Sequence, residues 1–239
     1  MKKYTKLTAS LLLAAAMSFV CVSCKDDDKN SEKKEVTTEA SDFQKKIGGT
    51  FVELFTEKGF TASKYNDYWL ECCAKYVGAD NAEATYQTLK TTMTGTLYGL
   101  EAQNKYGDGT DNFPNGYQFN CGFIGGVSKF VISGKKITGL DSDSKIVFSH
   151  EYTQTGEVND YYFFKSDDNN EDQFKYFLFC GDTPAETYHL EFRYGNDSTA
   201  LYDMFKGPYA YWLAAAMLEN ETETNAKACI KLFCDENLK

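Results

Sequence analysis

The sequence FKYFLFCGDTPAETYHLEFRYGNDS, residues 174–198, predicts two β-strands, the connection between them and the start of a helix. Gln173–Cys180 and Thr187–Tyr194 are dense in aromatic residues, which fit the pleated surface of a sheet. Gly195–Ser198 then ends the second strand and supplies a helix N-cap at Asp197 or Ser198. A strand pair followed directly by a helix is therefore expected here.

Short β-rich runs divided by turn residues also precede this stretch. Ser133-Gly134-Lys135 is a tight-turn signal between two of these runs. Ile47–Phe55, with glycines on both sides, predicts an earlier strand. The remaining runs that predict strands are Tyr117–Phe123, Lys129–Ser133, Lys136–Leu140, Lys145–Tyr152 and Asp160–Lys165.

Helices are predicted on both sides of the strands. After a first helix, described below, a second helix starts near Asp80, and a closing helix covers Glu221–Phe233. Consecutive antiparallel strands flanked by helices predict an α+β domain around a barrel. The first helix has one apolar face at positions i, i+4, i+7 and i+11, formed by Tyr65, Trp69, Cys72 and Tyr76.

The N-terminus has the pattern of a bacterial lipoprotein signal peptide. Three lysines among the first six residues precede Leu11–Val22, an apolar run too short to cross a bilayer with room to spare. This run ends in Val22-Ser23-Cys24, a small residue followed by cysteine. We expect cleavage after residue 23 and a lipid on Cys24 that holds the protein on a membrane. An ordinary signal peptide with an incidental cysteine is the alternative.

The segment after Cys24 predicts a tether. Residues 24–41 are polar and begin with three consecutive aspartates after Lys25, so they bury too little apolar surface to order themselves. We therefore expect a signal peptide at residues 1–23, a flexible acidic tether at 24–41 and one domain at 42–239. The expected location is the bacterial outer membrane, facing the periplasm or the cell surface.

The charge of the chain excludes nucleic acid as a partner. The formal net charge is −10, and removal of residues 1–23, which carry three lysines and no acid, makes it −13. A binding surface for phosphates needs a basic stripe, and the sequence has none. A negative field instead attracts cations.

The cysteines leave disulfide pairing open. Beyond Cys21 and Cys24 an even number remains, which suits disulfides in an oxidising compartment, but six cysteines allow 15 pairings. We therefore expect them to be structural or free. These cysteines are Cys72, Cys73, Cys121, Cys180, Cys229 and Cys234.

Two histidines, His150 and His189, are all that the chain has, and this scarcity argues against most enzymes. The sequence contains no G-x-S-x-G elbow, P-loop, dinucleotide fingerprint or H-E-x-x-H helix. We therefore predict that the protein is not an enzyme. His150 is expected to be structural.

The candidate metal ligands lie around His189. On a strand, Thr187, His189, Glu191 and Arg193 share one face, because residues two apart point the same way. Asp182 can fold back from the end of the preceding strand, so one imidazole and two carboxylates converge as ligands suited to zinc. The alternative is a solvent-exposed face on which Glu191 pairs with Arg193.

The same region resembles a known family. The segments FKYFLFCGD, HLEFRYGNDS and GPYAYW, residues 174–182, 189–198 and 207–212, are similar in order and spacing to the ZinT (YodA) family of calycin-like proteins that bind zinc and cadmium. Ile47-Gly48-Gly49-Thr50-Phe51 resembles that family's W-x-G-x-W strand, with Ile47 and Phe51 at the two tryptophan positions. The resemblance implies a calycin- or lipocalin-like antiparallel β-barrel.

The resemblance also implies a metal site. The family's three histidine ligands fall on Asp182, His189 and Glu191, so one histidine is kept and two positions become carboxylates. Oxygen ligands weaken the preference for Zn²⁺ and admit Mn²⁺, Fe²⁺ or Cd²⁺. We expect a lipid-anchored protein that scavenges a divalent ion and delivers it, with a metal ABC importer as a partner. The alternatives are a lipocalin-like binder of small apolar ligands and a surface interaction lipoprotein without a metal site.

Overall fold

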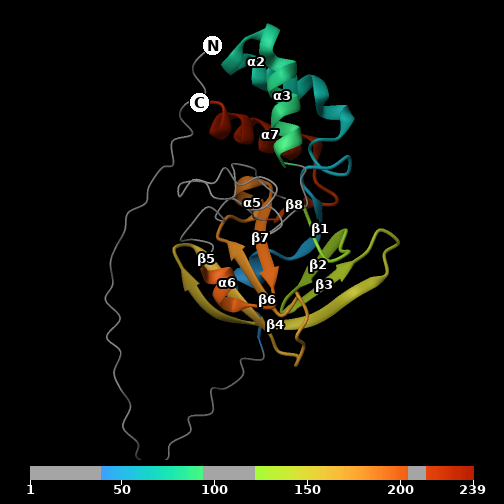
Figure 1. The fold of residues 1–239 in the computed structure, drawn as a ribbon, viewed down its shortest axis with the longest axis vertical. Helices are drawn as coiled ribbons and strands as arrows, with labels where there is room; N and C mark the ends of the chain where they lie inside the picture. Colours follow the sequence, from blue (N-terminus) through green and yellow to red (C-terminus); the bar gives the residue numbers. More distant parts are fainter. Residues whose placement is uncertain (1–38, 94–121, 204–213) are drawn as a thin grey trace, which may run out of the picture. The chain divides into compact units, whose positions relative to one another are not determined.

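The computed structural model describes residues 39–93, 122–203 and 214–239. Within these ranges the chain forms a closed antiparallel barrel in which each strand pairs with its neighbours in sequence order (Figure 1). Pairing of the first strand with the last, through Val52 and Met217, closes the barrel. This up-and-down order is the lipocalin-like arrangement, so the expected α+β barrel with flanking helices is confirmed.

The barrel strands are short, apart from one. A long β4 pairs with β3 at one end and with β5 at the other, so one chain segment spans both halves of the sheet. The strands are β1 (Gly49–Glu53), β2 (Lys129–Ser133), β3 (Lys136–Leu140), β4 (Ile146–Val158), β5 (Tyr161–Ser166), β6 (Tyr176–Cys180), β7 (Leu190–Gly195) and β8 (Ala214–Leu218).

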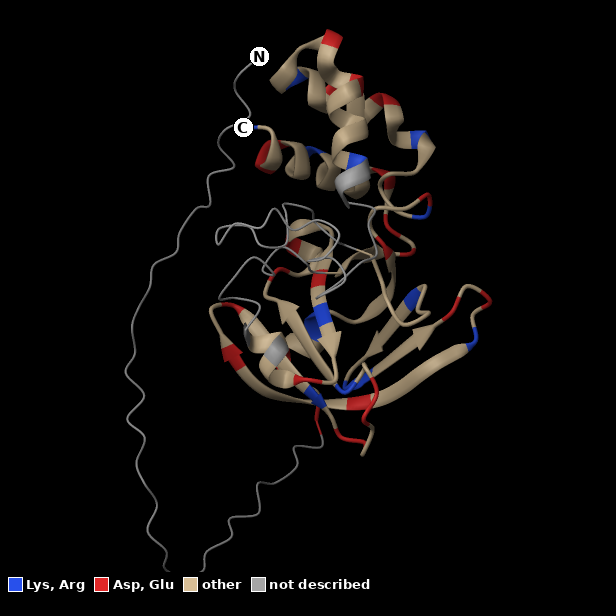
Figure 2. Ribbon diagram, in the orientation of Figure 1, with Lys and Arg blue, Asp and Glu red and all other residues tan. Residues whose placement is uncertain are grey.

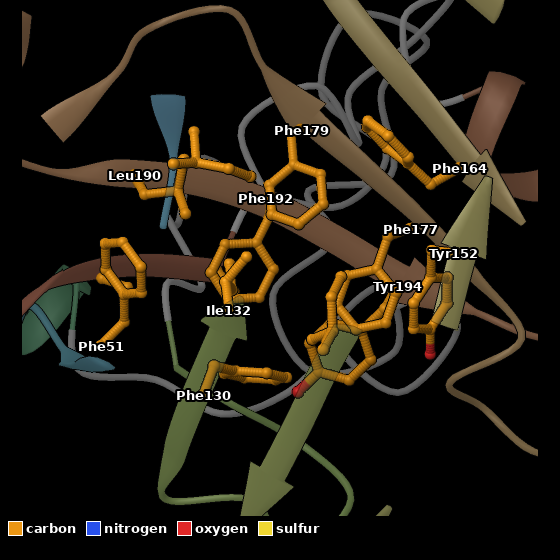
Figure 3. Packing of buried hydrophobic residues seen from close by; sticks show 14 of the residues in the cluster. Phe51, Phe130, Ile132, Tyr152, Phe164, Phe177, Phe179, Leu190, Phe192 and Tyr194 are labelled. Carbon is orange, nitrogen blue, oxygen red and sulfur yellow. The ribbon is translucent and has the colours of Figure 1, made fainter. Parts of the chain in front are cut away.

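Aromatic rings fill the barrel interior (Figure 3). Phe192 is 1% exposed, and its ring centroid lies 5.0 Å from that of Phe130 and 5.4 Å from that of Phe179. Phe177 stacks on Tyr194 at 5.2 Å. Each fully buried ring of this size contributes about 2–3 kcal/mol of transfer free energy. The interior is therefore a packed core.

A second apolar cluster covers the outer face of β1 and β8. Along β8, Ala214 and Ala216 face the interior core, while Ala215 and Met217 belong to the outer cluster. This alternation follows from the two-residue period of a strand. The outer cluster is closed by side chains of three helices, α2 (Asn66–Val77), α3 (Ala79–Met93) and α7 (Glu223–Asn237).

A short helix, α1 (Asp42–Lys46), precedes the first strand. Ser41 and Gln44 form a capping box, in which the Ser41 hydroxyl accepts from the Gln44 N–H and the Gln44 carboxamide accepts from the Ser41 N–H. Gln44 is buried and donates its side-chain N–H to the Tyr152 carbonyl at 2.9 Å. The ring of Phe43 stacks on Tyr162 at 4.1 Å. These contacts fix α1 against β4 and β5.

Several predicted elements match the structure. Lys129–Ser133 and Lys136–Leu140 are strands with the predicted bounds, and the helices near residues 66 and 80 are present. The predicted strand Ile47–Phe55 is shorter, and the predicted strand Lys145–Tyr152 continues to Val158. Residues 117–121 of the predicted strand Tyr117–Phe123 lie outside the described ranges.

One prediction was wrong, and one strand was missed. Thr187–Tyr194 is not one strand, because Pro184–Thr187 forms the short helix α5 and β7 begins at Leu190. Pro184 occupies the first turn of α5, where its fixed φ and missing N–H are tolerated. Strand β8 was not predicted.

None of the helices in residues 39–93, 122–203 and 214–239 is both long enough and apolar enough to cross a membrane. The predicted signal peptide at residues 1–23, Cys24 and nearly all of the predicted tether at 24–41 lie outside these ranges. The lipid anchor therefore stays a prediction.

Replacing Phe192 by alanine tests the packed interior. Phe192→Ala removes a buried ring that contacts Phe123 and the aromatic rings of β2, β6 and β7, so we expect the free energy of unfolding to fall by about 3–5 kcal/mol in urea denaturation. The control is Ile146→Ala, because Ile146 is 68% exposed and should change stability by less than about 0.5 kcal/mol. Equal effects of the two substitutions would contradict the barrel described here.

Candidate metal centre

The connection between β6 and β7 carries the predicted ligands. Strand β6 ends at Cys180, Asp182 follows two residues later, and α5 spans Pro184–Thr187. Tyr188 then adopts a left-handed conformation (φ 63°, ψ 13°), which ends α5 and turns the chain into β7. His189 therefore lies immediately before β7, and Thr187 belongs to α5 and does not share a strand face with it.

Strand β7 keeps its predicted alternation. Leu190, Phe192 and Tyr194 are at most 6% exposed and face the barrel interior, while Glu191 is half-buried on the opposite face. Glu191 pairs in register with Ala215, a member of the outer cluster. The candidate ligands thus lie on the outer face of the barrel, beside the helical layer.

His189 and Glu191 contact each other directly. His189 Nε2 lies 3.5 Å from Glu191 Oε1, and the two side chains are 14% and 34% exposed. His189 Nδ1 lies 2.9 Å from the Thr187 carbonyl oxygen, which can only accept a hydrogen bond, so Nδ1 carries a proton. The same nitrogen lies 3.8 Å from Cys229 Sγ on α7.

This hydrogen bond fixes the orientation of the ring. With Nδ1–H donating to the backbone, Nε2 is the nitrogen left to bind a metal ion, and it already points at a carboxylate. Metal-binding histidines usually donate their other ring N–H to a backbone carbonyl or a carboxylate, which sets the tautomer and the ring orientation. Local geometry therefore holds His189 with Nε2 toward a carboxylate, the orientation that a metal ligand would need.

Neighbouring groups shift the pKa values of His189 and Asp182. Burial lowers the pKa of His189, but its contacts with Cys229 and Glu191 outweigh this effect and raise the pKa well above 6.5. Burial raises the pKa of Asp182, Glu191 raises it further, and His189 lowers it. The charges of His189 and Glu191 therefore both act on Asp182.

A fourth group, Glu236, comes from α7. Burial raises its pKa, His189 lowers it, and Glu191 and Asp182 raise it again. Glu236 and Cys229 are seven residues apart, which is two helical turns, so both lie on the α7 face toward His189. Neither residue was predicted to belong to the site. A contact between residues about 40 positions apart in the chain leaves no local pattern in the sequence.

The side chains are not preassembled around a single point. In residues 39–93, 122–203 and 214–239 no three His, Cys, Asp or Glu side chains are placed to hold a metal ion together. His189 and Glu191 form a contact pair, and Asp182 stands apart from it. A bound ion would require the carboxylates of Asp182 and Glu191 to swing toward Nε2.

His150 has different partners. It lies in β4, and its Nδ1 is 2.7 Å from Asp168 Oδ2 while its Nε2 is 3.7 Å from Asp172 Oδ2. Both aspartates belong to the connection between β5 and β6. The ring also stacks on Phe148 at 5.7 Å.

Comparisons with known proteins give weak similarity. No family model and no curated protein matches the chain. The Zn(II)-bound ZinT-like domain of Streptococcus pneumoniae AdcA is 12% identical with a TM-score of 0.47, over 86% of this chain and 94% of that one. Zn(II)-bound AdcA from Streptococcus pneumoniae is 10% identical with a TM-score of 0.44, over 79% of this chain and 34% of that one, so this chain spans about a third of AdcA. Similarity at this level does not place the chain in a family.

The titration of His189 tests the described contacts. In metal-free protein we expect this imidazole to titrate well above pH 6.5, because Cys229 and Glu191 stabilise its protonated form. A raised folded-state pKa stabilises the fold fully below the unfolded value, and this contribution disappears as pH rises through the folded value. The free energy of unfolding of the wild type should therefore fall more than that of His189→Gln from neutral to mildly alkaline pH.

The same titration can be followed by NMR of the imidazole rings. Because the chain has two histidines, the His150→Gln variant assigns the His189 signals. A His189 midpoint at or below 6.5 would contradict the described contacts.

Proposed function

We propose that the protein is a lipid-anchored, extracytoplasmic protein that binds a divalent metal ion, most readily Zn²⁺, and serves in metal scavenging or delivery. One observation carries the proposal. His189 is held by the Thr187 carbonyl with its Nε2 directed at Glu191, in an acidic neighbourhood that includes Asp182.

The chemistry of the ligands fits a divalent cation. Neutral imidazole with the carboxylates of Asp182 and Glu191 supplies one nitrogen and two oxygen donors, which suit tetrahedral Zn²⁺ with water in the fourth place. The two negative charges balance the ion, so little net charge stays in a partly buried site. The same donors accept Mn²⁺, Fe²⁺ or Cd²⁺ when those ions are more abundant.

Electrostatics of the free protein support a cation in this position. The pKa values of Asp182 and Glu236 are raised, first by burial and partly by the other carboxylates nearby. A divalent ion would relieve this repulsion and displace the proton that His189 holds. Affinity should therefore rise with pH across the range in which His189 loses its proton.

The position of the site favours reversible loading. Glu191 is 34% exposed on the outer face of the barrel, so an ion can enter from solvent and leave again. Charge of both signs lies along β7, and acidic residues lie on α7 (Figure 2). A cargo site of this kind suits a protein that hands its ion to another, for which we propose a metal ABC importer.

The alternative of a small apolar ligand inside the barrel is less favoured. Phe130, Phe177 and Phe192 contact one another across the interior at ring distances of 5.0–6.2 Å (Figure 3). An apolar ligand would have to displace these rings at the cost of their packing. A surface protein that no longer binds metal is an outcome that the titration below can reveal.

Zinc titration calorimetry on metal-free protein tests the site. We expect one Zn²⁺ per chain near neutral pH, with proton release as the imidazolium gives up its proton. His189→Ala should weaken binding by roughly two orders of magnitude or more, because a direct ligand matters at least as much as its supporting hydrogen bonds.

The matched control is His150→Ala, which removes the other imidazole and should leave zinc affinity within a few-fold of the wild type. Asp182→Asn and Glu191→Gln keep the size of each side chain and should each weaken binding. If the wild type binds no metal, or if His189→Ala binds as the wild type does, the proposed site is wrong.

The anchor is tested separately. In a bacterial host, the wild type should incorporate labelled fatty acid and partition into the detergent-rich phase of a detergent extraction, because acyl chains hold it at the bilayer. Cys24→Ala should lose both properties, while Cys21→Ala serves as the control and should keep them. Lipid-free wild-type protein would leave the ordinary signal peptide as the explanation.

A further inference from the structure

Helices α2 and α7 bring four cysteines into one buried cluster. Cys72 and Cys73 lie on α2, and Cys229 and Cys234 lie on α7. All four are at most 3% exposed and belong to the outer cluster between the helices and the barrel. All four are free thiols in the structure, and which of them can pair depends on which of them face each other.

Two contacts on either side of Cys73 and Cys234 fix how α2 and α7 face each other. One turn before Cys73, Trp69 packs edge-on against Phe233 with ring centroids 5.9 Å apart. About one turn after Cys73, the Tyr76 hydroxyl donates to Asp235 Oδ1. Phe233 and Asp235 are the immediate neighbours of Cys234. The two contacts therefore bracket Cys73 and Cys234 and place these two positions opposite each other.

The two thiols also act on each other directly. A hydrogen bond with Cys234 lowers the pKa of Cys73 against the opposing effect of burial. The same hydrogen bond, together with burial, raises the pKa of Cys234. The two thiols are therefore within hydrogen-bonding reach of each other when α7 is docked on α2.

We propose that Cys73 and Cys234 form a disulfide that ties the C-terminal helix α7 to α2. Small buried side chains on closely packed helices allow the short Cα separation that a disulfide needs. The bond would join positions 161 residues apart in sequence and close most of the domain into one covalent loop.

The other two thiols of the cluster have different neighbours. Cys72 hydrogen bonds with Tyr68 on its own helix. Cys229 Sγ lies 3.8 Å from His189 Nδ1, beside the β6–β7 connection. Cys72 and Cys229 thus have hydrogen-bonding partners other than Cys73 and Cys234.

The oxidant we propose is a small or protein disulfide, acting by thiol–disulfide exchange. The thiolate of one of the two cysteines attacks one sulfur of the oxidant RS–SR, forming a mixed disulfide and releasing one RS⁻. The other cysteine loses its proton and attacks the sulfur of the first, forming the Cys73–Cys234 bond and releasing the second RS⁻. Two cysteine thiols are oxidised, RS–SR is reduced to two thiols, and the two cysteine protons end on the released thiolates.

Burial dictates when this exchange takes place. Cys73 and Cys234 are both 0% exposed, so an oxidant reaches them before α7 docks or while it is detached. Once formed, the bond keeps α7 in place, and α7 carries Cys229 and Glu236 next to His189. The proposal does not depend on metal binding, because it rests on contacts between α2 and α7 alone.

Peptide mapping of the full chain tests the proposal. The reduced, denatured chain is refolded with a mixture of oxidised and reduced glutathione, alkylated and digested with trypsin without reduction. Cleavage after lysine gives peptide 65–75 with Cys72 and Cys73, peptide 228–231 with Cys229 and peptide 232–239 with Cys234. We expect a linked product of 65–75 and 232–239, which reductant separates.

Single substitutions assign the pair. Cys73→Ala and Cys234→Ala should each abolish the linked product, while the matched control Cys72→Ala should keep it. The proposal is overturned by three results: no linked product from the wild type, a link to 228–231 in its place, or a link that survives in Cys73→Ala.

Thermal unfolding of the wild type supplies a readout that needs no substitution. A disulfide that closes a loop this long lowers the conformational entropy of the unfolded chain and so stabilises the folded state. We therefore expect the oxidised protein to melt on the order of 10 °C above the reduced protein. Cys72→Ala should show the same difference. Equal melting temperatures of oxidised and reduced wild type would contradict a bond that holds α7 in place.

Discussion

The constraint on which the candidate site depends is the two-residue alternation along β7. Leu190, Phe192 and Tyr194 point into a core of aromatic rings, so Glu191 has to point out. A slip of one residue in register would bury the carboxylate of Glu191 among phenylalanines and expose three large apolar side chains. The free energy of the barrel core therefore fixes which groups reach the outer face.

The ends of β7 add the local detail that a metal ligand needs. Tyr188 ends α5 in a left-handed conformation, which leaves the Thr187 carbonyl free of the strand ladder and within 2.9 Å of His189 Nδ1. A backbone acceptor orients the imidazole more rigidly than a side-chain acceptor, because it has no rotamer freedom of its own. Nε2 is thereby directed at Glu191, and only the carboxylates would have to move to hold the proposed ion.

The sequence predicted the parts of the fold that depend on local signals. The turn at Gly134 (φ 57°) needs a residue that tolerates positive φ, and the strands on both sides of it have the predicted bounds. Strand β8 escaped prediction, because the run Ala214–Leu218 is mostly alanine, which favours helices in isolation. Its pairing with β1 and β7 overrides that preference, and its small side chains let the helical layer approach the barrel.

The candidate site, too, was predictable only where it depends on local sequence. His189 and Glu191 could be placed on one face from spacing alone, because both belong to the same short segment. The strand was predicted to start too early at Thr187, since aromatic density outweighed the helix-initiating effect of Pro184. Glu236 and Cys229 could not be found from spacing, because their place beside His189 depends on how α7 packs.

The position of α7 therefore links the stability of the domain to the electrostatics of the site. One part of α7 packs on α2 through Phe233 and Cys234, and the same helix presents Glu236 to Asp182, His189 and Glu191. If α7 detached, the buried thiols would reach solvent, and the carboxylates of Asp182 and Glu191 would regain water and lose the neighbouring charge of Glu236. Docking of α7 costs free energy in carboxylate repulsion and desolvation, and the apolar cluster between α2, α7 and the barrel offsets it. A helix held mainly by packing at one face can in this way keep an acidic site partly buried, which a loop without such a cluster could not do.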